Sequence, residues 1–133
     1  MTYSELVSTD DLSESVPTKI NENFRKRSFL NAAAMSASFT VWADDSAGDP
    51  TDIYLVTTAS STIVATLPAA ASADAAAGRV VTIMKVDSGG GSVTIDGDGS
   101  ETINGATTVS LASQYNYRTI VSNGTTWFVI GSS

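Results

Sequence analysis

Short alternations of apolar and polar residues cover most of the chain after residue 38 and predict β-strands. The clearest is Arg79–Val86, in which Val81, Ile83 and Lys85 fall on one face. The other face carries three apolar residues and a threonine, so both faces should be at least half buried. β-Branched side chains pack well on a pleated surface. We therefore expect a central strand here.

Turn signals separate this strand from its neighbours. Gly89-Gly90-Gly91 predicts a tight turn or bulge, with glycines at positive φ, that leads into a more exposed strand at Ser92–Asp96. Asn123-Gly124, between two alternating segments, predicts a hairpin. Further strands are expected at Phe39–Trp42, Asp52–Thr58, Ser61–Pro68, Thr107–Leu111, Tyr117–Ser122 and Thr126–Ile130. Short strands at intervals of roughly 8–14 residues favour a small antiparallel β-sandwich or barrel-like domain.

Two segments lack this alternation. Ala69–Ala77 is alanine-rich, and it predicts a short helix or an irregular loop that crosses one end of the sheet. Residues 1–16 are polar and acidic, which fits an extended arm that orders against another surface, or simple disorder. Pro17 suits the start of a short helix, and Ala32–Ser38 is typical of a helix end or a linker. The chain thus divides into an arm with a short helix (1–38) and a β domain (39–133).

The charges are unevenly distributed. The net charge is −7, yet four of the seven basic residues lie between Lys19 and Arg27. Arg25, Lys26 and Arg27 form either a solvated helix face that complements the helix dipole or a contact to an acidic docking surface. From residue 31 on, nine acidic residues face three basic ones, so the β domain is an unfavourable partner for nucleic acid.

The composition narrows the possible chemistry. The chain has no cysteine and no histidine, which removes disulfides, thiolates, the commonest general base and the commonest transition-metal ligand. No apolar segment approaches the roughly 18–20 residues of a membrane span, and the N-terminus does not resemble a secretion signal. Alanine is abundant and bulky residues are few, which predicts a thin core of the kind that is often completed by other copies of the chain.

Few residues are candidates for a reactive or metal site. Asp96, Asp98 and Glu101 resemble part of a calcium loop, but the pattern is incomplete and an ordinary turn explains it as well. Asp44, Asp45 and Asp49 make a weaker cluster. Lys85 lies inside a strand without a serine–lysine motif and is a poor activator of a nucleophile. We expect no catalysis, no cofactor and no resident metal.

Aromatic residues suggest a contact surface instead. Trp127 and Phe128 are neighbours in the last strand, so they point to opposite faces, and one of them is directed away from the core of its own subunit. A neighbouring subunit would cover that side chain. Tyr115 and Tyr117 would share a face in an extended segment, where they either pack in the core or an interface, or stack on a sugar ring.

The β domain resembles a module that recurs in head-fibre and tail-fibre proteins of tailed bacteriophages. The resemblance covers about residues 52–131 and rests on the order and spacing of five short motifs. These are Y-x-V-T at Tyr54–Thr57, T-x-x-x-x-L-P-A at Thr62–Ala69, A-G-R-x-V-T-I-x-K at Ala77–Lys85, E-T-I-x-G at Glu101–Gly105 and V-S-N-G-T-x-W-x-x-I at Val121–Ile130. The segment DLSESVPTKINENFRKR also resembles N-terminal attachment segments of phage virion proteins, though less closely.

The resemblance implies a homotrimeric structural or adhesive protein of the virion, with no catalytic residues. No repeats or long heptad runs form a shaft, which favours a capsid decoration or head-fibre protein bound to the major capsid protein or another virion protein. The residues expected to dock it are Leu12, Ile20, Phe24, Arg25, Lys26 and Arg27, and the expected subunit interface contains Trp127 and Phe128. The alternative is a short tail-fibre or tail-tip protein that binds a host-surface glycan.

Overall fold

The computed structural model describes residues 30–43, 51–76 and 78–133 of the chain. This part is built from β-strands and contains no helix. The strands are β1 (Ala32–Met35), β2 (Phe39–Thr40), β3 (Ile53–Val56), β4 (Ile63–Thr66), β5 (Val80–Lys85), β6 (Val93–Asp96), β7 (Thr108–Leu111), β8 (Tyr117–Ser122) and β9 (Trp127–Ser132). The predicted arm and short helix over residues 1–29 lie outside the described residues, as do Asp44, Asp45 and Asp49.

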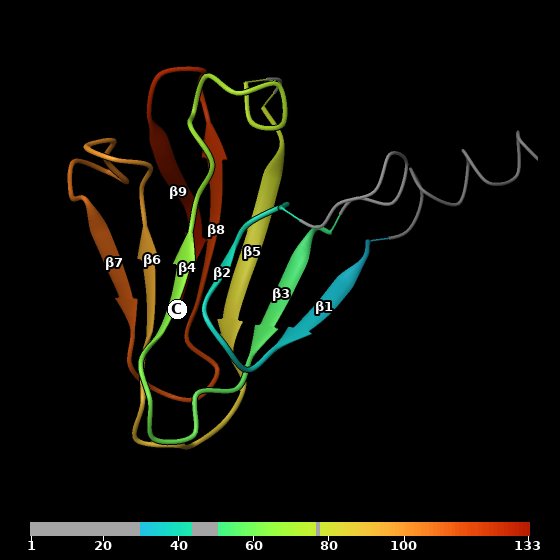
Figure 1. Cartoon of the computed structure of the whole chain (residues 1–133), viewed down its shortest axis with the longest axis vertical. Helices are drawn as coiled ribbons and strands as arrows, with labels where there is room; N and C mark the ends of the chain where they lie inside the picture. The colour runs from blue at the N-terminus through green and yellow to red at the C-terminus, as the bar shows by residue number, and fades with distance from the viewer. Residues whose placement is uncertain (1–29, 44–50, 77) are drawn as a thin grey trace, which may run out of the picture.

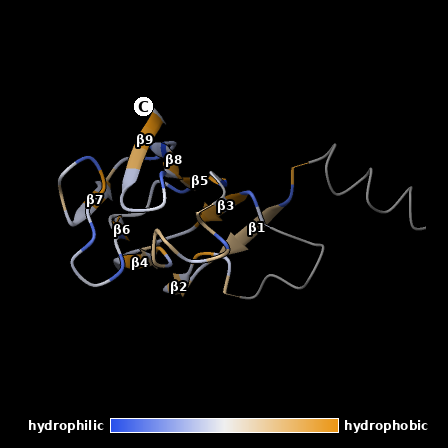
Figure 2. Ribbon diagram, turned by 90° about the horizontal axis from the view of Figure 1, so that it is seen from above, coloured by the Kyte–Doolittle hydropathy of each residue, from blue (hydrophilic) through white to orange (hydrophobic). Residues whose placement is uncertain are grey.

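Two mixed sheets face each other. One has the order β1-β3-β5-β8-β9 and the other the order β2-β4-β6-β7. Figure 1 shows both sheets with their strands running along the long axis, and Figure 2 shows them from above as two layers. The prediction of a mainly β, two-layered domain is confirmed, and β5 is the central strand of its sheet, as expected.

The prediction that the sheets are antiparallel is wrong for most of the fold. β1, β3 and β5 pair in parallel, and so do β2, β4 and β6. Along the chain, strands alternate between the two sheets, so that β1–β2, β3–β4 and β5–β6 form three successive coils. Parallel neighbours need a crossover connection, and here each crossover contains the strand of the opposite sheet. Among the named strands, the antiparallel pairs are β5–β8, β6–β7 and β8–β9.

The prediction that the glycine triplet forms a tight turn or bulge with glycines at positive φ is wrong, because β5 and β6 belong to different sheets and none of the three glycines has a positive φ. Gly89-Gly90-Gly91 instead crosses from one sheet to the other and stacks on the preceding crossover. The Gly91 amide donates to the Ala59 carbonyl at 3.0 Å. A Cβ on Gly91 would lie 2.0 Å from the Ser61 carbonyl oxygen, and one on Gly89 would lie 2.0 Å from that of Ala59. Close backbone approach, rather than positive φ, therefore requires glycine here.

Other expectations have mixed outcomes. The Asn123-Gly124 hairpin is confirmed, since Ser122 pairs with Trp127 across it. The alanine-rich segment after β4 is the irregular loop rather than the helix over its described residues, and its Ala70 and Ala75 are buried. Ala32–Met35, expected in a helix end or linker, is instead strand β1, because its backbone pairs with β3. The division of the chain at residue 38 stays a prediction.

The core lies between the two sheets. Val81, Ile83 and Lys85 share the inner face of β5, as the alternation predicted, and all three are fully buried. The inner faces of β4 and β6 oppose them with Ala65 and Ile95, among others. The other face of each strand therefore lies on the outside of the sandwich.

Candidate assembly surface

The outer face of the five-stranded sheet is apolar and uncharged. Its members are the residues that alternate with the buried ones along β1, β3, β5, β8 and β9. They are Ala32, Ala34, Ile53, Leu55, Val80, Thr82, Met84, Tyr117, Thr119, Val121 and Phe128. We call this set the uncharged face. Among its large apolar side chains, Val80 and Phe128 are 39 % and 41 % exposed. Exposed apolar patches mark contact sites.

The polar groups at the centre of the uncharged face bond to each other. Thr82 on β5 pairs with Thr119 on β8, and their hydroxyl oxygens are 2.9 Å apart in a hydrogen bond. Thr119 in turn pairs with Gly131, which adds no side chain to the surface. If a partner covered this region, both hydroxyl groups would keep this hydrogen bond. A dry interface requires that its buried polar groups be hydrogen-bonded.

The opposite outer face, on the four-stranded sheet, has a different character. Hydroxyl-bearing side chains dominate it, and one carboxylate, Asp96, lies among them in β6. The others include Thr40, Thr66, Thr94, Thr108 and Ser110, which are paired across the strands. A shallow hollow of about 340 Å³ on this side is lined by Ser38, Phe39, Thr40, Val64 and Thr66. This face suits contact with water, so the two outer faces of the sandwich are unequal.

Trp127 and Phe128 point to opposite sides of β9, as predicted. The Trp127 side chain is completely buried, its ring lies 6.1 Å from that of Trp42, and its Nε1 donates to Glu101 Oε2 at 3.3 Å. Trp127 therefore has no surface to offer another subunit. Phe128 is 41 % exposed on the uncharged face. Its role in a subunit interface stays a prediction.

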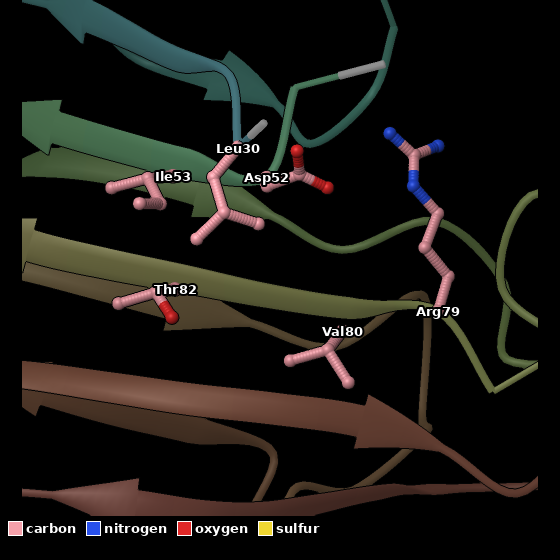
Figure 3. A pocket seen from close by; sticks show the side chains of 6 residues that line it. All are labelled: Leu30, Asp52, Ile53, Arg79, Val80 and Thr82. Atoms are coloured by element: carbon pink, nitrogen blue, oxygen red, sulfur yellow. The ribbon is translucent and has the colours of Figure 1, made fainter. Parts of the chain in front are cut away.

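A hollow of about 220 Å³ opens on the uncharged face near the start of β3 and β5. Figure 3 shows the six residues that line it: Leu30, Asp52, Ile53, Arg79, Val80 and Thr82. The two charged residues have partners inside the chain. Asp52 Oδ2 accepts a hydrogen bond from the Asn31 amide at 3.0 Å. The Arg79 guanidinium lies 4.0 Å from the centre of the Trp42 ring and donates to the Thr51 carbonyl.

A second cluster of charge joins the crossovers at the other end of the sheets. The buried Lys85 ammonium donates to Asp87 Oδ1 at 3.0 Å and to the carbonyls of Asp87 and Gly89 at 2.7 and 3.0 Å. The Asp87 carboxylate also accepts from the amides of Thr58, Ala59 and Gly89. The Thr58 amide first, and then Lys85, lower the pKa of Asp87 far below its usual range. Because all three Lys85 protons are directed at acceptors, this lysine holds the loops together and is not positioned as a nucleophile.

Glu101, in the segment that resembles part of a calcium loop, makes hydrogen bonds to other parts of the fold. The Glu101 carboxylate accepts the Ala70 amide at 2.9 and 3.1 Å in addition to the Trp127 indole. Asp98 is exposed, and its carbonyl accepts the Glu101 amide. In the described part of the chain, histidine, cysteine and acidic residues form no group of three or more that could hold a metal ion. The contacts of Glu101 favour a structural turn.

Tyr115 is the other prominent exposed aromatic side chain. It is 63 % exposed and has a φ of 66°, which is unusual for a residue other than glycine. The Tyr115 amide donates to the Lys85 carbonyl at 2.7 Å, and the Asn116 carbonyl accepts the Lys85 amide. The end of β5 thus holds the loop that displays this ring.

Comparison with known protein families finds no family model that matches the chain, and comparison with curated proteins finds no match either. Residues 30–43, 51–76 and 78–133 include no helix long and apolar enough to cross a membrane.

The residues that were predicted to dock the protein lie outside the described residues. They are Leu12, Ile20, Phe24, Arg25, Lys26 and Arg27. The uncharged face as a whole was not predicted from the sequence. The sequence did contain an indication of it, because Arg79–Val86 and Asp52–Thr58 carry apolar residues on both faces.

Proposed function

We propose that this protein is a structural component of a bacteriophage virion: a homotrimeric capsid decoration or head-fibre protein docked by its N-terminal arm. The single observation that carries the proposal is the uncharged outer face of the five-stranded sheet. In this proposal, that face packs against the same chain in the neighbouring subunits.

The charge distribution supports self-association through this face. Each chain carries a net charge of −7, so copies repel each other at long range and need a contact surface without charge. The cores of protein interfaces are depleted of charged residues and enriched in aromatic residues and methionine. The uncharged face contains Met84, Tyr117 and Phe128 and fits this description.

The arm would supply the contact with the virion. The apolar residues Leu12, Ile20 and Phe24 would bury against a capsid protein, and the basic run Arg25–Arg27 would lie on an acidic part of its surface. The role is mechanical rather than catalytic, which agrees with a chain that has no histidine or cysteine and directs its buried lysine at fixed acceptors.

Co-sedimentation with tail-less phage heads tests the proposal. The full chain should pellet with heads, and a chain without residues 1–29 should remain in the supernatant although it stays folded and trimeric. Replacing Arg25, Lys26 and Arg27 by alanine should weaken binding and reduce its dependence on salt. Equal binding by the full and the shortened chain would contradict docking by the arm.

Tyr115 favours a second candidate function, a short tail-fibre or tail-tip protein that binds a host-surface glycan. An exposed aromatic ring on a firmly held loop is a suitable platform for a sugar ring, and strained backbone conformations cluster at binding sites. The same sedimentation experiment with host cells separates the two functions. Binding to cells that survives removal of residues 1–29, and is lost on Tyr115→Ala but kept on Tyr115→Phe, would support the receptor-binding function instead.

A further inference from the structure

We infer that neighbouring copies of this chain join edge to edge, with Phe128 of one copy inserted into the hollow between β1, β3 and β5 of the next. The inference rests on the self-assembly in the proposed function and specifies its interface. It describes a heterologous contact, in which each subunit uses two different surfaces, so that copies can close into a ring.

The two surfaces lie toward opposite edges of the same sheet. The strand order β1-β3-β5-β8-β9 places Phe128 on the edge strand β9, whereas the hollow is lined from β3, from β5 and from Leu30, which precedes the other edge strand, β1. Two strand spacings, about 10 Å, separate the backbone of Phe128 from that of Val80 at the hollow. Phe128 is not among the residues that line the hollow of its own chain. In our inference, the Phe128 side chain that fills it comes from a neighbouring chain.

Both surfaces also lie at the same level along the strands. Phe128 pairs with Val121 on β8, and Val121 pairs with Val80 on β5. Subunits related by an axis parallel to the strands can then join without a shift along that axis. A closed ring, rather than an open filament, requires this together with a rotation between subunits that divides the full turn.

The hollow matches the phenyl ring of Phe128 in size and in chemical character. The hollow has a volume of about 220 Å³, and a cavity of roughly 150 Å³ lined by apolar side chains is enough to bind benzene. Leu30, Ile53 and Val80 supply apolar walls, and Leu30 and Val80 are 74 % and 39 % exposed before any partner arrives. The charged groups of Asp52 and Arg79 at its rim have partners within the chain, so a phenyl ring need not displace them.

Charged substitutions on each surface test this contact. Phe128→Asp removes the inserted ring but keeps the hollow, and Val80→Asp charges the hollow but keeps the ring. Both positions are partly exposed, so we expect both variants to fold, and circular dichroism and thermal unfolding check this. Each variant alone should be monomeric in sedimentation velocity. An equimolar mixture should form a dimer, because one contact between an intact ring and an intact hollow remains.

Controls distinguish the possible failures. Phe128→Ala should weaken assembly by about tenfold or more, as expected for an aromatic residue at the centre of a contact, and Tyr115→Ala should leave it unchanged. A mixture that stays monomeric at ten times the concentration at which the wild type assembles would overturn the inference. So would a Phe128→Asp variant that assembles like the wild type, although self-assembly itself would stand. A wild-type chain that is monomeric would overturn the homotrimer and this contact together.

Discussion

Asp87 is the residue on which most local interactions converge. Its two carboxylate oxygens accept hydrogen bonds from Lys85 in β5, from Thr58 and Ala59 in the crossover after β3, and from Gly89 in the crossover after β5. The only cation among these partners is Lys85, which is itself completely buried. The carboxylate therefore joins two successive coils and balances a charge that the fold removes from water.

Replacing Asp87 by asparagine should destabilise the protein at neutral pH. An asparagine side chain has one oxygen, so its amide group would face N–H donors whichever way it is turned. We expect a lower midpoint of thermal unfolding than for the wild type. Asp74→Asn, which removes the same charge from an exposed position in the loop after β4, is the control and should leave the midpoint close to that of the wild type.

The stabilisation by Asp87 should depend on pH in a defined direction. Because the pKa of Asp87 is lower in the folded protein than in the unfolded chain, the carboxylate contributes its full stabilisation above the unfolded pKa of about 4. This contribution is lost as the pH falls below about 4. The difference in unfolding midpoint between the wild type and Asp87→Asn should therefore shrink toward about pH 2. A difference that grows on acidification would contradict this role.

At the scale of elements, the stacked crossovers set the spacing between coils. Gly91 and Gly89 touch the carbonyls of Ser61 and Ala59, whereas Gly90 between them has no other atom within 4 Å of the position of a Cβ. Three adjacent glycines thus have two different environments, and only the outer two are fixed by packing.

This difference predicts opposite results for neighbouring substitutions. Gly91→Ala should lower the free energy of unfolding by about 3 kcal/mol, the upper end of the range for overpacking, because its Cβ would meet rigid backbone. Gly90→Ala should change it by no more than about 0.5 kcal/mol. Urea denaturation measures both. Equal losses would show that backbone freedom, and not close approach, explains the triplet.

Much of each strand was predictable, but the pairing was not. The alternation in Arg79–Val86 places Val81, Ile83 and Lys85 on one face, and Asn123-Gly124 marks a true hairpin, because both signals are local. A parallel coil has no such local signal. In the parallel part, a strand pairs with the second strand after it in the chain, as β3 pairs with β5 through Ile53 and Thr82. A short glycine-rich connection is compatible with either a hairpin or a crossover between sheets.

The candidate site was only partly predictable for the same reason. That Trp127 and Phe128 face opposite ways follows from strand geometry alone. The alignment of Phe128 with Val121 and Val80, and the hollow beside them, depends on register between strands that are distant in sequence. The uncharged face emerges only when five strands are placed side by side.

At the scale of the whole molecule, the two outer faces of the sandwich differ in kind. One is uncharged and carries the exposed Phe128, and the other carries hydroxyl groups and Asp96. A monomer in water would gain nothing from this inequality, whereas a ring of subunits would bury the first face and expose the second. The central claim is that copies of the same chain cover the uncharged face.

Sedimentation equilibrium of the full chain tests this claim most directly. We predict a single species with three times the mass of one chain, and no dissociation on raising the salt concentration, because the only charged residues at the contact, Asp52 and Arg79, already have partners within their own chain. A species with the mass of one chain, at every concentration up to that used for binding to heads, would contradict the account.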